Sequence, residues 1–246
     1  MNTQALNIKY IVGKQFSEFA SNKKTVVLTD DLSSLLQNDQ NEADNVKYIV
    51  GQGNSVSKIN EILKNLKDEN KKIALDGSAF EIADRSLTHK HSEKNILVSA
   101  PRKLDTDNYS ANLLIDSPAE LEDHVTGQHV PGMLLVEASR QMFIAVMEKF
   151  FLKKESPDKQ FYFVLNSINS EFINYCFPIP AKMILNIQSF ETIKPDMFLS
   201  KCKISVFQIP GRCCCNIFME FRIINHKILA FLEKSKAFEA LELILL

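Results

Sequence analysis

The sequence lacks an excess of charge of either sign. Its 29 Lys and Arg residues nearly balance its 30 Asp and Glu residues, and the formal net charge is −1. No overall field therefore favours binding to nucleic acid or to an anionic membrane. The first residues are polar and contain no apolar run typical of a signal peptide, so we expect a soluble, cytoplasmic protein.

Cysteine pairs with metal-binding or redox spacing are also missing. The chain has 5 cysteines, of which three are adjacent, and no Cys-x-x-Cys pair. An odd count without such pairs argues against a disulfide framework or a zinc ribbon. Neighbouring residues on a strand point to opposite faces, so Cys213, Cys214 and Cys215 are not expected to share one metal ion or one catalytic site.

Proline is missing from the first 100 residues. Short apolar runs alternate there with amphipathic stretches, a pattern typical of a parallel sheet with helical crossovers. We therefore predict a small α/β domain over residues 1–85, linked near Asp84–Thr88 to a second domain over residues 86–246. The expected elements of the first domain are strands at 8–12, 25–29, 46–50 and 73–75 and a helix at 55–66.

The second part of the chain combines one long apolar run with long strand candidates. No Pro or Gly interrupts the run between Gly132 and Leu152, which predicts a buried helix. The strand candidates have short connections and indicate an antiparallel sheet. The expected fold class is α+β, with the sheet wrapped around the helix, because each then buries the apolar face of the other. The expected strands lie at 95–101, 109–116, 160–172, 181–191, 198–209 and 212–224.

Polar residues on the buried helix mark a candidate site. One arc of roughly 100° holds Glu137, Arg140, Gln141 and Glu148. Burying a carboxylate there is costly unless it is paired or neutralised. Glu137 is therefore a general acid or base with a pKa raised by burial, or the partner of Arg140 or Gln141. Arg140 could instead bind a phosphate or carboxylate of a substrate, or pair with Glu148.

Two histidines precede the helix. His124 could transfer a proton near neutral pH, or be a surface loop residue. His129 could line a pocket, or only cap the helix entry. The backbone N–H of Gly132 would lie at the positive end of the helix dipole, where it could polarise a carbonyl. A zinc site formed by His124, His129 and Glu137 matches no zinc-binding spacing, so we expect no metal.

Two further motifs have weaker functional interpretations. Gly51-Gln52-Gly53 lies between a predicted strand and a predicted helix, which is the position of a phosphate loop. It lacks the Gly-Lys-Ser/Thr ending, so a turn is the better interpretation. His89 and Lys90 could pair with acidic groups, but we interpret them as surface polar residues.

The run at residues 129–141, HVPGMLLVEASRQ, resembles the hallmark of the A-factor-biosynthesis (AfsA-like) hotdog domain family. The pair His89-Lys90 resembles the pair that opens this domain, and the resemblance extends from His89 to the last residue. The same run is similar, more distantly, to the hotdog acyl-carrier-protein dehydratases. In that pattern His124 would be the loop histidine and Glu137 the helical acid.

The resemblance implies a hotdog fold, a homodimer joined edge to edge, and acyl thioesters of acyl carrier protein or coenzyme A as substrates, with no bound cofactor. It implies acyl transfer in the synthesis of a butyrolactone-type signal or another secondary metabolite. A 3-hydroxyacyl-thioester dehydratase and a non-catalytic acyl-binding or assembly subunit remain as alternatives. Together with the resemblance, the residues predict catalytic roles for His124 and Glu137 and substrate contacts by His129, Gly132, Arg140 and Gln141.

Overall fold

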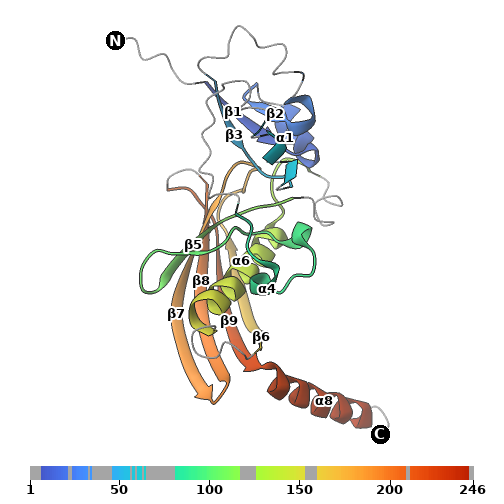
Figure 1. Cartoon of the computed structure of the whole chain (residues 1–246), viewed down its shortest axis with the longest axis vertical. Coiled ribbons are helices and arrows are strands. Elements are labelled where there is room, and N and C mark those ends of the chain that lie inside the picture. Colours follow the sequence, from blue (N-terminus) through green and yellow to red (C-terminus); the bar gives the residue numbers. More distant parts are fainter. Residues whose placement is uncertain are drawn as a thin grey trace.

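A computed structural model gives the arrangement of the chain (Figure 1). A small parallel sheet lies at one end of the molecule, and a larger antiparallel sheet with a long helix against it forms the main body. None of the helices in the described part of the chain is long and apolar enough to cross a bilayer. The structure describes residues 7–21, 24–32, 34, 46–55, 57–58, 60–62, 64, 81–116, 126–152, 160–208 and 211–243.

The small sheet has three parallel strands in the order β2-β1-β3, as the alternation of strands and helices predicted. The expected strand at 73–75 lies outside the described residues, and those described at 57–64 are helical, as expected. The elements of this part are β1 (Asn7–Val12), η1 (Lys14–Phe16), α1 (Ser17–Ser21), β2 (Val26–Leu28), η2 (Thr29–Asp31) and β3 (Val46–Val50).

The large sheet has six strands in the order β4-β5-β7-β8-β9-β6, and every neighbouring pair is antiparallel. This confirms the antiparallel sheet and places the four long strands close to their predicted positions. The strand expected at 95–101 is wrong, because it forms only isolated bridges. The strands are β4 (Arg102–Lys103), β5 (Asn108–Asn112), β6 (Phe161–Phe172), β7 (Lys182–Lys194), β8 (Met197–Phe207) and β9 (Cys213–Asn225).

Helix α6 (Gly132–Val146) lies against the concave face of this sheet and continues as the π-helix η6 (Met147–Leu152) (Figure 1). Apolar residues occupy most of the circumference of the helix, and they are buried. Phe143 stacks on Phe221 of β9 at 4.3 Å between ring centroids. A curved antiparallel sheet around one central helix is the hotdog fold that the sequence predicted.

The Gly51–Gly53 loop joins the small sheet to the hotdog. The backbone N–H of Gln52 donates to Pro178 O at 2.9 Å, and that of Gly53 donates to Ile115 O at 2.7 Å. The Gln52 side chain adds hydrogen bonds with Leu113 O and Ile115 N–H. Since these donors bind the protein itself, the structure favours the turn over the phosphate loop.

The segment expected to link the two domains is instead ordered. Asp84 caps helix α4 (Arg85–Thr88) by accepting a hydrogen bond from the Ser86 backbone N–H at 2.7 Å, and α4 packs against α6. Phe16 and Phe19 of the N-terminal part belong to the same apolar core as α6. The division into residues 1–85 and 86–246 therefore stays a prediction.

A last helix, α8 (His226–Leu243), was not among the predicted elements. It follows β9 directly and projects away from the body on the side of β6 (Figure 1). Its residues from Ala230 to Glu242 are all exposed.

Candidate functional site

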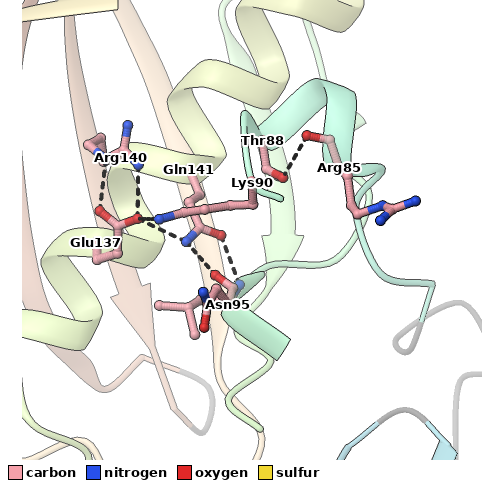
Figure 2. Close-up of polar contacts among 8 residues, drawn as sticks. Arg85, Thr88, Lys90, Asn95, Glu137, Arg140 and Gln141 are labelled. Atoms are coloured by element: carbon pink, nitrogen blue, oxygen red, sulfur yellow. Dashed lines mark hydrogen bonds and ion pairs between the residues drawn. The ribbon is translucent and has the colours of Figure 1, made fainter. Parts of the chain in front are cut away.

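Glu137 lies at the centre of a polar cluster on α6 (Figure 2). Arg140 binds its carboxylate with two hydrogen bonds, from Nε to Oε2 at 2.8 Å and from Nη2 to Oε1 at 2.9 Å. Lys90 Nζ lies 2.7 Å from Oε1, and Gln141 Nε2 donates to the same oxygen at 3.0 Å. The sequence predicted the i+3 and i+4 partners. The cluster carries two cations and one carboxylate, so its local charge is positive.

Gln141 connects this cluster to the segment that follows α4. Its Oε1 accepts a hydrogen bond from the Leu97 backbone N–H at 2.8 Å, and its Nε2 donates to Asn95 O at 2.9 Å. The side chain is fully buried. These bonds occupy the Asn95 C=O and the Leu97 N–H, whereas Leu97 O and the Ser99 N–H bond to the backbone of residues 112–114. In this structure Gln141 holds the cluster in position.

The Glu137 carboxylate is ionised in this environment. Burial alone would raise its pKa, but the hydrogen bonds from Arg140, Lys90 and Gln141 and the charge of Arg140 outweigh it and lower the pKa from 4.5 to about 2. The expectation that burial raises the pKa of Glu137 is therefore wrong. The reason is that three donors converge on a carboxylate that is still 32% exposed.

This lowered pKa predicts a defined acid sensitivity. A carboxyl group whose pKa is lower in the folded state stabilises the fold above its unfolded-state pKa, and loses that effect as the pH falls toward its folded-state pKa. The difference in melting temperature between the wild type and Glu137→Gln should be full above pH 4.5 and should vanish near pH 2. Thermal unfolding at a series of pH values measures it, and a difference that does not depend on pH would contradict the ionised cluster.

His89 and Lys90 stay partly exposed, and both pair with acidic groups, which was the alternative that the sequence left open. Lys90 binds Glu137, and His89 Nε2 lies 2.9 Å from Glu148 Oε1. Adjacent residues of one segment thus reach two carboxylates about three turns apart, Glu137 on α6 and Glu148 on η6, which continues it. The sequence placed Glu137 and Glu148 on one arc of the helix. It could not identify His89 and Lys90 as their partners, because these residues are far away along the chain.

The beginning of α6 forms a second group of predicted site residues. Phe172 of β6 lies so close to Gly132 that a Cβ there would be 2.8 Å from its ring, so a larger residue would require the exposed Phe172 ring to shift. The ring of His129 lies 4.9 Å from that of Tyr175. In the described part of the chain no residue accepts a hydrogen bond from the Gly132 or Met133 backbone N–H. These two groups lie at the positive end of the helix dipole.

The structure thus divides the predicted site residues between two places on α6. Glu137, Arg140 and Gln141 form one cluster, whereas His129 and Gly132 lie near the helix start with no contact to that cluster among the described residues. His124 lies outside the described residues. Within the described ranges no three His, Cys, Asp or Glu side chains are grouped as metal ligands.

An exposed apolar strip on β6 borders both places and was not predicted. Phe163 faces α6, because it contacts Phe143 at 6.0 Å, and Phe172 faces α6 through Gly132. A bulge between Leu165 and Ser167 shifts the alternation, so Leu165 and Ile168 share this inner face. Leu165, Ile168 and Phe172 are nevertheless 41%, 41% and 56% exposed. The inner surface of the hotdog is therefore open beside β6.

A cleft of about 460 Å³ lies elsewhere, between the small sheet and the hotdog. Lys94 and Ile96 line it, whereas the alternate residues Asn95 and Leu97 bind Gln141 on the other side of the segment. None of the predicted site residues lines this cleft.

The five cysteines are free thiols, and all except Cys213 are buried. Cys202 and Cys215 are buried in the core, where burial raises the pKa of each thiol to about 12. A thiol that stays protonated is a poor nucleophile. Cys214 differs, because a hydrogen bond with Cys176 lowers the pKa of its thiol.

The comparison with protein families identifies the same domain as the sequence motifs. Residues 73–178 match the AfsA family, described as the A-factor biosynthesis hotdog domain. The match includes both the His89-Lys90 pair and the run at residues 129–141, so the resemblance is confirmed for this segment. Both motifs contribute to the Glu137 cluster: the first supplies Lys90, and the second supplies Glu137 with its helical partners. No curated protein matches the chain.

Solved structures that resemble the chain cover about half of it. A mutant thioesterase from Pseudomonas aeruginosa has 13% identity and a TM-score of 0.42, with 56% of this chain and 88% of that chain covered. The protein AziG from S. sahachiroi has 10% identity and a TM-score of 0.38, with 52% and 91% covered. A hypothetical thioesterase with coenzyme A from Streptococcus pneumoniae has 7% identity and a TM-score of 0.35, with 51% and 84% covered. Similarity at this level says nothing about the activity of this chain.

Proposed function

We propose that this hotdog domain transfers an acyl group from a thioester of acyl carrier protein or coenzyme A to a hydroxyl group of a small acceptor. A butyrolactone is an ester of a hydroxyl group, so an alcohol is the acceptor class that fits a role in making such a signal or a related secondary metabolite. The match to the A-factor biosynthesis hotdog domain supports this reaction class.

The three donors that converge on the Glu137 carboxylate, and keep it ionised, are the observation that carries the proposal. Dehydration of a 3-hydroxyacyl thioester by a helical acid requires a carboxyl group that can donate a proton. A carboxyl with a pKa of about 2 has no proton to donate near neutral pH. A permanently charged carboxylate can instead accept a hydrogen bond from an acceptor hydroxyl and orient it. Acyl transfer therefore fits Glu137 better than dehydration.

The residues would divide the chemistry as follows. Glu137 orients the acceptor hydroxyl, while Lys90 and Gln141 position Glu137. Arg140 keeps one guanidinium nitrogen, Nη1, that Glu137 does not use and that can bind an anionic group of the substrate. His124 would accept the hydroxyl proton, because an ordinary imidazole titrates near neutral pH and Glu137 is too weak a base.

The thioester itself would be bound at the start of α6. The Gly132 N–H at the positive end of the helix dipole would stabilise the negative charge that develops on the carbonyl oxygen. His129 and Phe172 lie beside this position and would border the acyl group. The acceptor oxygen bonds to the carbonyl carbon, the carbon–sulfur bond breaks, and the hydroxyl proton passes through His124 to the leaving thiolate.

Mass spectrometry of the full chain with an acyl-acyl carrier protein, or the matching coenzyme A thioester, and a panel of small polyols tests the proposal. We expect release of the free thiol together with an acylated polyol. A 3-hydroxyacyl thioester that loses one water would support the dehydratase instead. Tight binding of the acyl carrier without turnover of any thioester would support a non-catalytic acyl-binding subunit.

The free edge of the large sheet supports the expected homodimer. Strand β6 is 12 residues long and pairs only with β9 within the described sheet, so its outer edge has unpaired backbone groups. We predict that two copies pair through β6, and that Ile168→Lys, on the exposed apolar strip, weakens this dimer. Light scattering at micromolar concentration should give twice the chain mass for the wild type, and a monomeric wild type would contradict the prediction.

A further inference from the structure

Helix α8 has a surface that nothing in the described chain covers. Phe231, Phe238 and Leu241 are 73%, 66% and 63% exposed, and only the first residues of the helix contact β6 and β9. Two phenylalanines exposed to this extent on one 18-residue helix form an unusually apolar surface for a soluble protein. In Figure 1 the helix extends beyond the β6 edge of the sheet and not over the body.

A second uncovered surface lies at the other end of the same strand. Phe172, Ile173 and Tyr175 are 56%, 53% and 67% exposed and follow one another where β6 ends. We call these three residues the apolar patch. It adjoins the candidate site, because Phe172 touches Gly132 and Tyr175 touches His129. Any segment that covers the patch therefore also covers the beginning of α6.

A two-fold axis through paired β6 strands brings the two surfaces together. Strands related by such an axis are antiparallel, so the start of one β6 lies beside the end of the other. The His226 backbone N–H donates to Gln160 O at 2.9 Å, which fixes the start of α8 at the start of β6. At 1.5 Å per residue the helix is about 27 Å long and can cross several neighbouring strands. Its direction in Figure 1 leads toward a copy paired at β6.

We propose that in the homodimer α8 of each copy packs on the apolar patch of the other copy and closes its candidate site. The proposal rests on the β6 dimer predicted above. Each aromatic side chain buries about 150–250 Å² when fully covered. Two helices and two patches would then contribute on the order of 1,000 Å², a large share of the roughly 1,600 Å² typical of a specific interface. The occupant of the patch is thus a second copy of this chain, and each site contains residues from two copies.

Photo-crosslinking tests this contact directly. Phe238 is replaced by p-benzoylphenylalanine in a dimer reconstituted from unlabelled and isotopically heavy copies of the full chain. We expect mixed-mass cross-links that map to residues 169–177. The control places the same probe at Leu104, which is 53% exposed on the turn between β4 and β5, and should give no cross-link to this segment. Cross-links within one copy only, or to other parts of the second copy, would overturn the proposal.

A pair of charge substitutions tests the energetic contribution. Phe231→Glu together with Phe238→Glu alters only exposed side chains, so the fold should remain intact. We expect the dimer dissociation constant to rise at least about tenfold, whereas Leu104→Glu should leave it unchanged. A double variant that dimerises as tightly as the wild type would overturn the helix contact while leaving the β6 dimer standing. Dimerisation is measured without substrate, so this result is independent of the proposed acyl transfer.

Discussion

Replacing Glu137 with glutamine should lower the rate of acyl transfer by about 10²-fold while the protein stays folded, because the acceptor hydroxyl is no longer held in place. The amide keeps nearly the same shape and can still accept a hydrogen bond from Arg140, but it has no charge with which to orient an acceptor hydroxyl. The lost ion pairs should cost about 1–2 kcal/mol, because the carboxylate is partly exposed. Single-turnover kinetics and thermal unfolding of the same preparation measure both effects.

Glu148→Gln is the matched control for this change. It also removes a carboxylate on the same arc of α6, here the partner of His89, and should cost a similar amount of stability. It has no part in the proposed chemistry, so its turnover should stay within a few-fold of the wild type. Equal losses of activity in the two variants would show that the cluster is only structural, and full activity of Glu137→Gln would exclude Glu137 from the reaction.

Gly13→Ala should have the largest effect on stability. A Cβ at Gly13 would lie 1.9 Å from Gly53 O, a backbone atom that cannot turn away as a side chain would. Overpacking of this kind costs about 3 kcal/mol or more, which corresponds to a fall in melting temperature of roughly 6–12 °C for a chain of this size. Because Gly53 also binds Ile115 of the hotdog, we expect the loss to affect the whole molecule in one transition.

Gly211→Ala provides the comparison for this prediction. Gly211 has a φ of +83°, and no atom lies within 4 Å of the position of an added Cβ. The alanine there should cost only the strain of its backbone conformation, about 1 kcal/mol. If Gly13→Ala unfolds at the same temperature as Gly211→Ala, the tight contact between the two loops does not exist in solution. Differential scanning calorimetry of both variants makes this comparison.

The main body of the fold could be predicted because its elements are long and their patterns are regular. The uninterrupted run after Gly132 predicted α6, and alternation predicted β9 almost to the residue. Helix α8 was missed because its apolar face is narrow: Phe231, Phe238 and Leu241 lie along one line of a helix whose remaining surface is largely charged or polar. The strand expected at 95–101 was wrong because this segment forms only short bridges to two neighbouring segments and its first part is bound by the Gln141 side chain.

Only those contacts of the candidate site that join near neighbours in the sequence could be predicted. The contacts of Glu137 with Arg140 and Gln141 follow from helical spacing, and both are present. The pKa of Glu137 was predicted in the wrong direction, because the hydrogen bond and charge of Arg140, reinforced by Lys90 from a distant segment, outweigh the effect of burial. Long-range contacts of this kind depend on how α4 and the segment after it pack on α6. This packing cannot be predicted from the spacing of residues along the chain.

The two edges of the large sheet differ in a way that limits how many copies can assemble. The β4 edge is only two residues long and consists of Arg102 and Lys103, both exposed. A short cationic edge repels another copy of itself and offers few backbone groups for pairing. The 12-residue β6 edge is open, so the sheet can be extended on one side only. Once two β6 strands have paired, no comparable edge is left, and growth stops at two chains instead of continuing into a fibre.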